Sequence, residues 1–116
     1  MMLGMDASHP APGRRPLDQD DADRMAAHFK LLGDPGRLQI VHTLLEAGAM
    51  CVGDIAQVLD SSESATSHQL RQLRLAGLVR SRRDGREVHY RIADLHIRLL
   101  LDVAAEHYLH DHGDHR

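Results

Sequence analysis

Aromatic residues are scarce in this chain of 116 residues, which has no tryptophan, two tyrosines and one phenylalanine. A core must therefore be built from Leu, Ile, Val, Ala and Met, and a chain of this length predicts one domain with a modest core. The single cysteine, Cys51, excludes an internal disulfide and a zinc site built from several cysteines, and it favours a reducing compartment. No apolar run approaches the ~18 residues that a membrane span needs, and the N-terminus has no signal-peptide pattern. We therefore expect a cytoplasmic protein without a membrane partner.

Charge is unevenly distributed along the chain. The formal net charge is −3 at pH 7, so there is no global positive field to attract nucleic acid. Residues 63–98, however, carry eight arginines against four acidic side chains. The middle of the chain is its basic part, and a nucleic-acid contact is expected there.

Proline and glycine divide the chain into segments. Residues 1–17 hold three of the four prolines and predict a flexible N-terminal tail. Residues 18–110 carry the regular apolar patterns of a folded domain. Residues 111–116 are polar and form a histidine-containing tail.

Apolar residues at helical spacing predict four helices within residues 18–76. These cover residues 18–32, 35–46, 51–59 and 63–76. Asp34 is expected as an N-cap with Pro35 at the first helical position, and Ser62 as the N-cap of the fourth helix. The third and fourth helices are joined by a short polar turn, which is the helix-turn-helix arrangement.

A β-hairpin and a last helix follow. Residues 78–83 and 86–92 read as two strands around Asp84-Gly85, a strong hairpin signal. A C-terminal helix then runs from about residue 93. The predicted fold class is mainly α with a small β-hairpin, a winged helix-turn-helix.

The fourth helix has one face that suits DNA. Thr66, Leu70, Leu73 and Gly77 fall on the side expected to pack inward. The outward side carries short hydroxyls, an imidazole and a guanidinium, which permit close approach to a groove and donate to phosphates and to guanine. These predicted DNA-contacting residues are Ser64, Ser67, His68 and Arg71. The alternative is an ordinary solvated face, although such faces usually mix Glu with Lys.

The hairpin is rich in arginine near its tip. Arg82, Arg83 and Arg86 are predicted to contact phosphate or the minor groove. A charged edge strand that resists aggregation is the other interpretation, and both can hold together.

The C-terminal helix carries a metal-ligand pattern that one copy cannot use alone. His96 and His107 lie on nearly the same face but ~16 Å apart along the axis at ~1.5 Å per residue. Metal–nitrogen bonds are only ~2 Å long. His107 and His110 are i and i+3 on the helix and close enough to chelate together. Asp94 and His96 sit at the first turn, where backbone bending lets the two side chains converge. Two antiparallel copies of the helix would complete two Asp/His/His/His shells, which predicts a homodimer through the terminal helices.

Three segments together resemble the winged-helix repressors of the arsenic- and metal-sensing ArsR–SmtB family. They read LGDPGRLQIVHTLL, CVGDIAQVLDSSESATSHQLRQLRLAGLV and RRDGREVHYRIADLH, and the resemblance covers roughly residues 22–110. It implies a repressor that binds double-stranded operator DNA as a homodimer and releases it when metal binds across the terminal helices. It also implies the ligand set Asp94, His96, His107 and His110.

The resemblance leaves the identity of the metal and of a second site open. Three nitrogens and one oxygen suit tetrahedral Zn(II), whereas Ni(II) often takes more ligands and Co(II) accepts either geometry. Possible accessory ligands are His112, His115 and His9. A second site near the third helix uses cysteines in the family, and this chain keeps Cys51 and Asp54 without the neighbouring cysteine.

Three other classes of function compete with this interpretation. A regulator of the same fold could respond to a partner protein or to a redox signal at Cys51. A metal-buffering protein without an operator is a different class, and the arginine-rich hairpin argues against it. An enzyme is not expected, because no nucleophile–base pair or glycine-rich phosphate loop is present.

Overall fold

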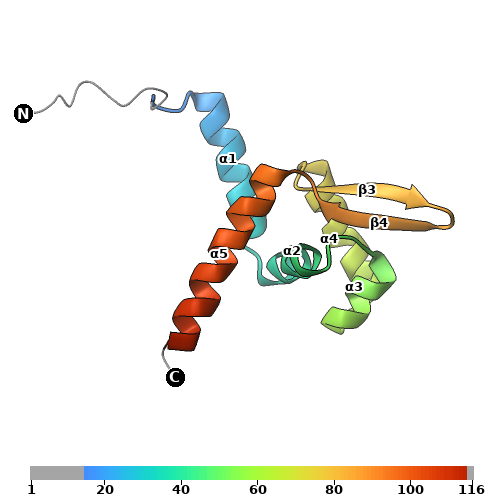
Figure 1. The fold of residues 1–116 in the computed structure, drawn as a ribbon. Helices are drawn as coiled ribbons and strands as arrows, with labels where there is room; N and C mark the ends of the chain where they lie inside the picture. Colours follow the sequence, from blue (N-terminus) through green and yellow to red (C-terminus); the bar gives the residue numbers. More distant parts are fainter. Residues whose placement is uncertain (1–14, 115–116) are drawn as a thin grey trace, which may run out of the picture.

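The structure is a computed structural model that describes the backbone of residues 15–114 and the side chains as far as Leu109. In chain order the elements are α1 (Gln19–Leu32), α2 (Pro35–Ala47), β2 (Met50–Cys51), α3 (Val52–Leu59), α4 (Glu63–Leu75), β3 (Val79–Asp84), β4 (Glu87–Ile92) and α5 (Leu95–Asp114). Figure 1 shows α1 and α5 on one side of the molecule, while the hairpin of β3 and β4 projects from the other. The last helix continues to Asp114, beyond the boundary expected at residue 110.

Side-chain caps begin the helices where the sequence predicts them. Asp34 Oδ2 accepts a hydrogen bond from Arg37 N at 3.0 Å, and Pro35 occupies the first turn of α2. Ser62 Oγ accepts from Ala65 N at 3.0 Å at the start of α4. Each cap satisfies one of the backbone N–H groups that a helix leaves without a partner. Both predicted caps are confirmed.

The sheet has three strands rather than the two of the predicted hairpin. Its order is β2-β4-β3, and the short β2 pairs antiparallel with β4 so that Cys51 lies opposite His89. Cys51 was expected at the start of a helix, and this was wrong: α3 begins at Val52. A strand of two residues has no periodicity that a sequence pattern can reveal.

The hairpin turn is displaced by one residue from the prediction. Asp84 pairs with Glu87, so the two turn residues are Gly85 and Arg86 rather than Asp84 and Gly85. Gly85 takes a φ of 67°, a conformation that glycine adopts without steric cost at the first turn position. Arg86 therefore lies at the very tip of the hairpin.

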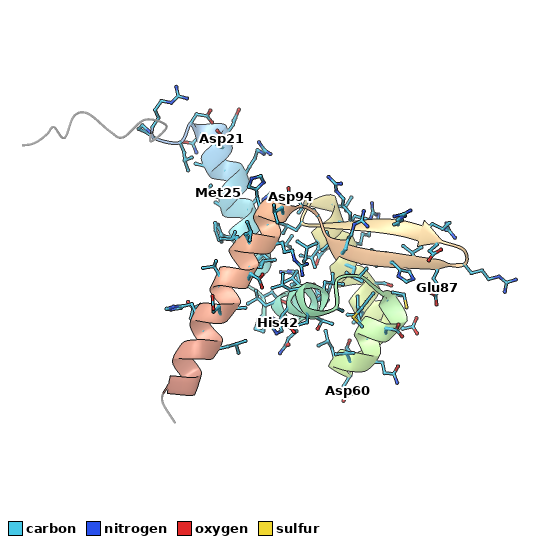
Figure 2. All side chains as sticks on the ribbon, in the orientation of Figure 1. Asp21, Met25, His42, Asp60, Glu87 and Asp94 are labelled. Atoms are coloured by element: carbon cyan, nitrogen blue, oxygen red, sulfur yellow. The ribbon has the colours of Figure 1, made fainter. Side chains whose placement is uncertain are left out.

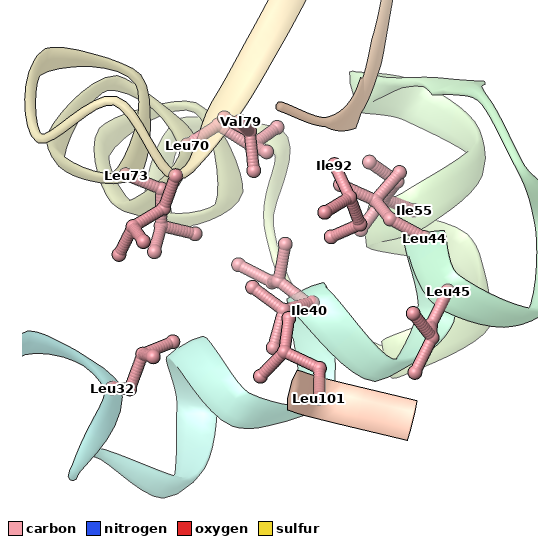
Figure 3. Close-up of a cluster of buried hydrophobic side chains, with 12 residues drawn as sticks. Leu32, Ile40, Leu44, Leu45, Ile55, Leu70, Leu73, Val79, Ile92 and Leu101 are labelled. Carbon is pink, nitrogen blue, oxygen red and sulfur yellow. The ribbon is translucent and has the colours of Figure 1, made fainter. Parts of the chain in front are cut away.

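The core lies where α2, α3, α4 and the root of the sheet meet, as Figure 3 shows. Leu44, Ile55, Leu70 and Leu73 are completely buried. The prediction that Gly77 packs inward was wrong, because α4 ends at Leu75 and Gly77 is an exposed turn residue with a φ of 79°.

The terminal helices leave much apolar surface uncovered in a single copy. Among its described side chains, α5 buries Leu101 in the core and packs the partly buried Ile97 against it. Most of its other large apolar side chains are more than half exposed, namely Leu95, Leu99, Leu100, Val103, Tyr108 and Leu109. On α1, Met25 and Phe29 are 48% and 55% exposed. None of the described helices is long and apolar enough to cross a membrane.

Leu70 and Leu75 provide a matched test of this core, because both lie on α4 and their exposures are 0% and 69%. Leu70→Ala should lower the free energy of unfolding by ~2–5 kcal/mol, since it removes buried methyl groups and leaves a cavity. Leu75→Ala should change it by less than ~0.5 kcal/mol. Urea unfolding at one fixed protein concentration measures both, and equal losses would contradict the assignment of the core.

Candidate nucleic-acid interface and candidate metal centre

α4 presents the predicted polar face to solvent. Thr66, Leu70 and Leu73 are buried under it, with exposures of 2%, 0% and 0%. The four side chains expected on the outer face are all exposed, and they are Ser64, Ser67, His68 and Arg71. Glu63, in the first turn, is the one acidic residue of the helix. The face therefore offers donors to an anionic partner along most of its length.

A hydroxyl network that the sequence did not predict holds α4 against α3. Thr66 Oγ1 donates to Ser62 O at 2.9 Å, and it lies 2.8 Å from Ser61 Oγ. Asp60 ends α3 in the left-handed conformation, with a φ of 53°. The short turn between the helices is therefore hydrogen-bonded to the end of α3 and to the first turn of α4.

The hairpin carries arginines that form no ion pair with a carboxylate of the described residues. Arg82, Arg83 and Arg86 are exposed at or near its tip. Within the described residues the ion pairs are Arg24–Asp21 at 3.8 Å and His89–Glu87 at 3.1 Å. The guanidinium groups of α4 and of the hairpin are thus available to a phosphate backbone.

The first predicted metal ligands lie at the start of α5, and one of them has a structural role. Asp94 Oδ1 accepts a hydrogen bond from Ile97 N at 2.9 Å and caps the helix, leaving the second carboxylate oxygen for another partner. His96 is exposed in the first turn. Figure 2 labels Asp94 at the end of α5 that lies nearest α1.

The remaining predicted ligands lie near the other end of α5. His107 is exposed, and its ring packs edge-on against Tyr108 with a centroid distance of 4.9 Å. His110 and His112 are on the helix, but their side chains lie outside the described part, as do His9 and His115 altogether. Among the described residues of one copy, no three His, Cys, Asp or Glu side chains come together as a metal site.

The possible second site is sparse. Cys51 is a half-buried free thiol in β2, and Asp54 is exposed in the first turn of α3. Cys51 lies opposite His89, whose ring is paired with Glu87. The thiol therefore has one imidazole neighbour across the sheet.

Arg37 is a residue that sequence analysis missed. From the first turn of α2, its side chain donates to Leu31 O at 2.6 Å, to Gln69 Oε1 at 2.9 Å and to Gln72 Oε1 at 3.0 Å. It thereby links α1 and α2 to α4. The only signal in the sequence is an arginine just after an Asp-Pro helix start, which does not reveal partners more than thirty residues away.

Known proteins are similar to this chain in sequence and in fold. The family described as "Bacterial regulatory protein, arsR family" matches residues 34–81. The chain is 46% identical over 91 residues to the transcriptional repressor SmtB homolog of Synechocystis sp., a match that covers 78% of this chain and 68% of that protein. It is 42% identical over 97 residues to the HTH-type transcriptional regulator NmtR of Mycobacterium tuberculosis, covering 84% of this chain and 80% of NmtR.

A solved structure is similar over nearly the same length. The homodimeric winged helix-turn-helix DNA-binding domain of Mb0332 from Mycobacterium bovis superposes with a TM-score of 0.72 at 32% identity, covering 86% of this chain and 95% of that one. The chain therefore belongs to the ArsR–SmtB family of bacterial regulatory proteins. It is a winged helix-turn-helix DNA-binding transcriptional regulator and not an enzyme.

Two substitutions of Asp94 test whether its hydrogen bond to Ile97 N stabilises the start of α5. Asp94→Ala should destabilise the metal-free protein by ~1 kcal/mol, because Ile97 N loses its acceptor. Asp94→Asn keeps an oxygen for the cap and should stay within ~0.5 kcal/mol of the wild type. Thermal unfolding in a chelator measures both. If Asp94→Asn is as destabilised as Asp94→Ala, the carboxylate charge rather than the hydrogen bond stabilises the helix start.

Proposed function

We propose that this protein is a homodimeric repressor that leaves its operator when a divalent transition metal binds between the α5 helices of two copies. Zn(II) is the first candidate, followed by Ni(II) and Co(II). The observation that supports this most is the uncovered apolar face of α5, with His96 near one end and His107 near the other. Because its proposed partner is operator DNA, we expect the protein to act in the cytoplasm.

Dimerisation through α5 and α1 follows from their exposed apolar side chains. Leu95, Leu99 and Val103 recur every four residues and form one stripe along α5. Beside α5 lies an apolar groove of about 340 Å³ between α2 and α5, lined by residues that include Leu38, Leu45 and Leu101. Burial of apolar area contributes ~25 cal/mol per Å², so a second copy that covers these surfaces would be strongly favoured.

An antiparallel α5 pair brings the predicted ligands together in the same register that buries the stripe. Around a two-fold axis near Leu101, His96 of one copy faces the His107 position of the other, and Leu100 faces the Val103 position. The pairing of Asp94 with His110 has nearly the same centre. One packing arrangement therefore serves both the apolar contact and the four-ligand shell.

The donors of α5 fit a borderline divalent ion. Neither His96 nor His107 has a hydrogen-bond partner among the described residues, so their ring nitrogens are free to coordinate. With one oxygen of Asp94 they supply part of an N₃O set that suits tetrahedral Zn(II), for which His110 would be the fourth donor. Ni(II) would need additional ligands, and the candidates are His112, His115 and His9.

DNA recognition is assigned to α4 and the hairpin. Ser64, Ser67, His68 and Arg71 would enter the major groove, since their helix face is exposed and almost free of acid. Arg82, Arg83 and Arg86 would bind phosphate or the flanking minor groove.

Release of DNA by metal is a linkage between two binding sites. Metal must bind the DNA-free dimer more tightly than the DNA-bound dimer, and the difference equals the loss in operator affinity. A coupling of ~3 kcal/mol corresponds to a change of about a hundredfold. The second protomer is essential to this mechanism, because one copy does not assemble the shell.

Operator binding measured by fluorescence anisotropy tests the proposal directly. The duplex is selected by the metal-free protein from a random pool, and titrations are run in chelator and with Zn(II), Ni(II) and Co(II) in turn. At least one ion should weaken binding by about a hundredfold.

His96→Asn with His107→Asn should bind the duplex as the wild type does in chelator and should not respond to metal. His28→Asn serves as the control, because His28 is a histidine of α1 outside the predicted ligand set. Tight binding that no ion alters would point to a partner protein or a redox signal instead. Metal binding without affinity for any duplex would point to a metal-buffering protein.

A further inference from the structure

Arg37 joins three helices through one side chain. Its backbone N–H donates to the cap of its own helix at Asp34, while the guanidinium reaches Leu31 O in the last turn of α1. The same group donates to the amide oxygens of Gln69 and Gln72 on α4, 32 and 35 residues away in the sequence. These contacts are partly buried, so water competes weakly for them.

The bonds at the two ends have different consequences. Leu31 O is one of the last carbonyls of α1 and lacks a partner within its helix, and a cation at this end of a helix is favourable. Gln69 and Gln72 lie three residues apart and so on one flank of α4. Two directional bonds on one flank resist rotation of α4 about its axis.

The hydrophobic core restrains the same helix less sharply. Leu70 and Leu73 keep one face of α4 turned inward, so a large rotation would expose them. Apolar contacts are non-directional, however, and allow small adjustments that hydrogen bonds of fixed geometry do not. The Arg37 contacts therefore fix the orientation of α4 within the range that the core allows.

Orientation matters because a dimer reads two half-sites at once. In helix-turn-helix dimers the half-sites lie about one turn of DNA, ~34–36 Å, apart, and the separation of the two recognition helices must match. α1 carries Met25 and Phe29 on the surface assigned above to the dimer contact. A link from the last turn of α1 to α4 thus joins the dimer surface to the reading helix.

We infer that Arg37 is a positioning residue that determines which half-site spacing the dimer accepts. The inference rests on the dimeric DNA-binding function proposed above. Loss of its contacts leaves α4 able to rotate, so the dimer fits several spacings with similar affinity. The chemistry recognised by each half of the dimer does not change.

The test compares affinities for duplexes that differ only in spacing. The selected operator is altered by inserting or deleting one base pair between its half-sites, which displaces one half-site by ~3.4 Å and rotates it by ~35°. Wild-type protein should lose affinity by about tenfold or more. Arg37→Met should lose less than about threefold, and Arg37→Lys should fall between them because an ammonium cannot reproduce the planar fork.

Two further variants separate positioning from other effects. Gln69→Met with Gln72→Met removes the acceptors on α4 while keeping Arg37 on Leu31 O, and it should lose spacing selectivity as Arg37→Met does. Arg24→Gln removes an arginine of α1 whose side chain is 77% exposed and, among the described residues, forms an ion pair with Asp21. This variant should keep the wild-type selectivity. Each selectivity is a ratio of two affinities from one preparation, so a partly unfolded fraction cancels.

The outcomes are distinct. The inference is overturned if Arg37→Met binds the duplexes of every spacing more weakly by the same factor. It is also overturned if the wild-type protein shows no spacing preference. Both results leave the proposed function unchanged. A wild type that binds no duplex overturns the proposed function itself. Lowered selectivity in both the Arg37 and the glutamine variants, with Arg24→Gln unchanged, establishes the positioning role.

Discussion

The structure depends on an apolar helix face that one copy of the chain cannot bury. α5 is twenty residues long, yet its described side chains that reach the core are the buried Leu101 and the partly buried Ile97. A hydrogen bond from Arg98 to Leu45 O at 2.9 Å also ties it to α2. Leu95, Leu99 and Val103 remain more than half exposed. A helix of this kind is stable in water when another apolar surface covers it. We attribute both the proposed dimer and the proposed metal shell to this single requirement.

The proposed DNA-binding surface depends on the contacts that hold α4 in place. The buried side of α4 packs on α2, and hydrogen bonds around Thr66 hold the turn that precedes α4. Arg37 donates hydrogen bonds to Gln69 and Gln72 on one side of the helix. The side chains on the outer side of α4 are therefore not needed for packing, and they can be short, polar or basic. Since α2 carries Arg37 at one end and accepts Arg98 near the other, it contacts both the reading helix and the helix assigned to metal. α2 is therefore the one helix that is hydrogen-bonded, among the described residues, to both α4 and α5.

Local chemistry was predictable from the sequence, and contacts distant in the chain were not. Asp34-Pro35 and Ser62 predict helix starts because capping acts within three residues, and both caps are where the pattern places them. β2 was missed because its two residues become a strand only by pairing with β4. Gly77 was misplaced because a helical wheel does not show where the helix ends. The Arg37 network joins residues more than thirty positions apart, a distance over which periodicity carries no information. For the metal site, the residue types, their spacing and the need for a second copy are readable from the sequence. They stay predictions, because the described residues of one copy do not bring three ligands together.

The central claim is that each metal shell takes ligands from two chains, and a mixed dimer tests it most directly. One protomer carries Asp94→Ala with His96→Ala, the other carries His107→Ala with His110→Ala, and two different affinity tags isolate the heterodimer. In a shared shell, one of the two sites keeps all four ligands in this heterodimer, whereas neither site does so in either variant's own homodimer. Metal analysis after gel filtration should therefore find one tightly bound ion per heterodimer and none in either homodimer. If the wild-type dimer holds two ions and the heterodimer is as empty as its parents, a metal shell shared between protomers is ruled out.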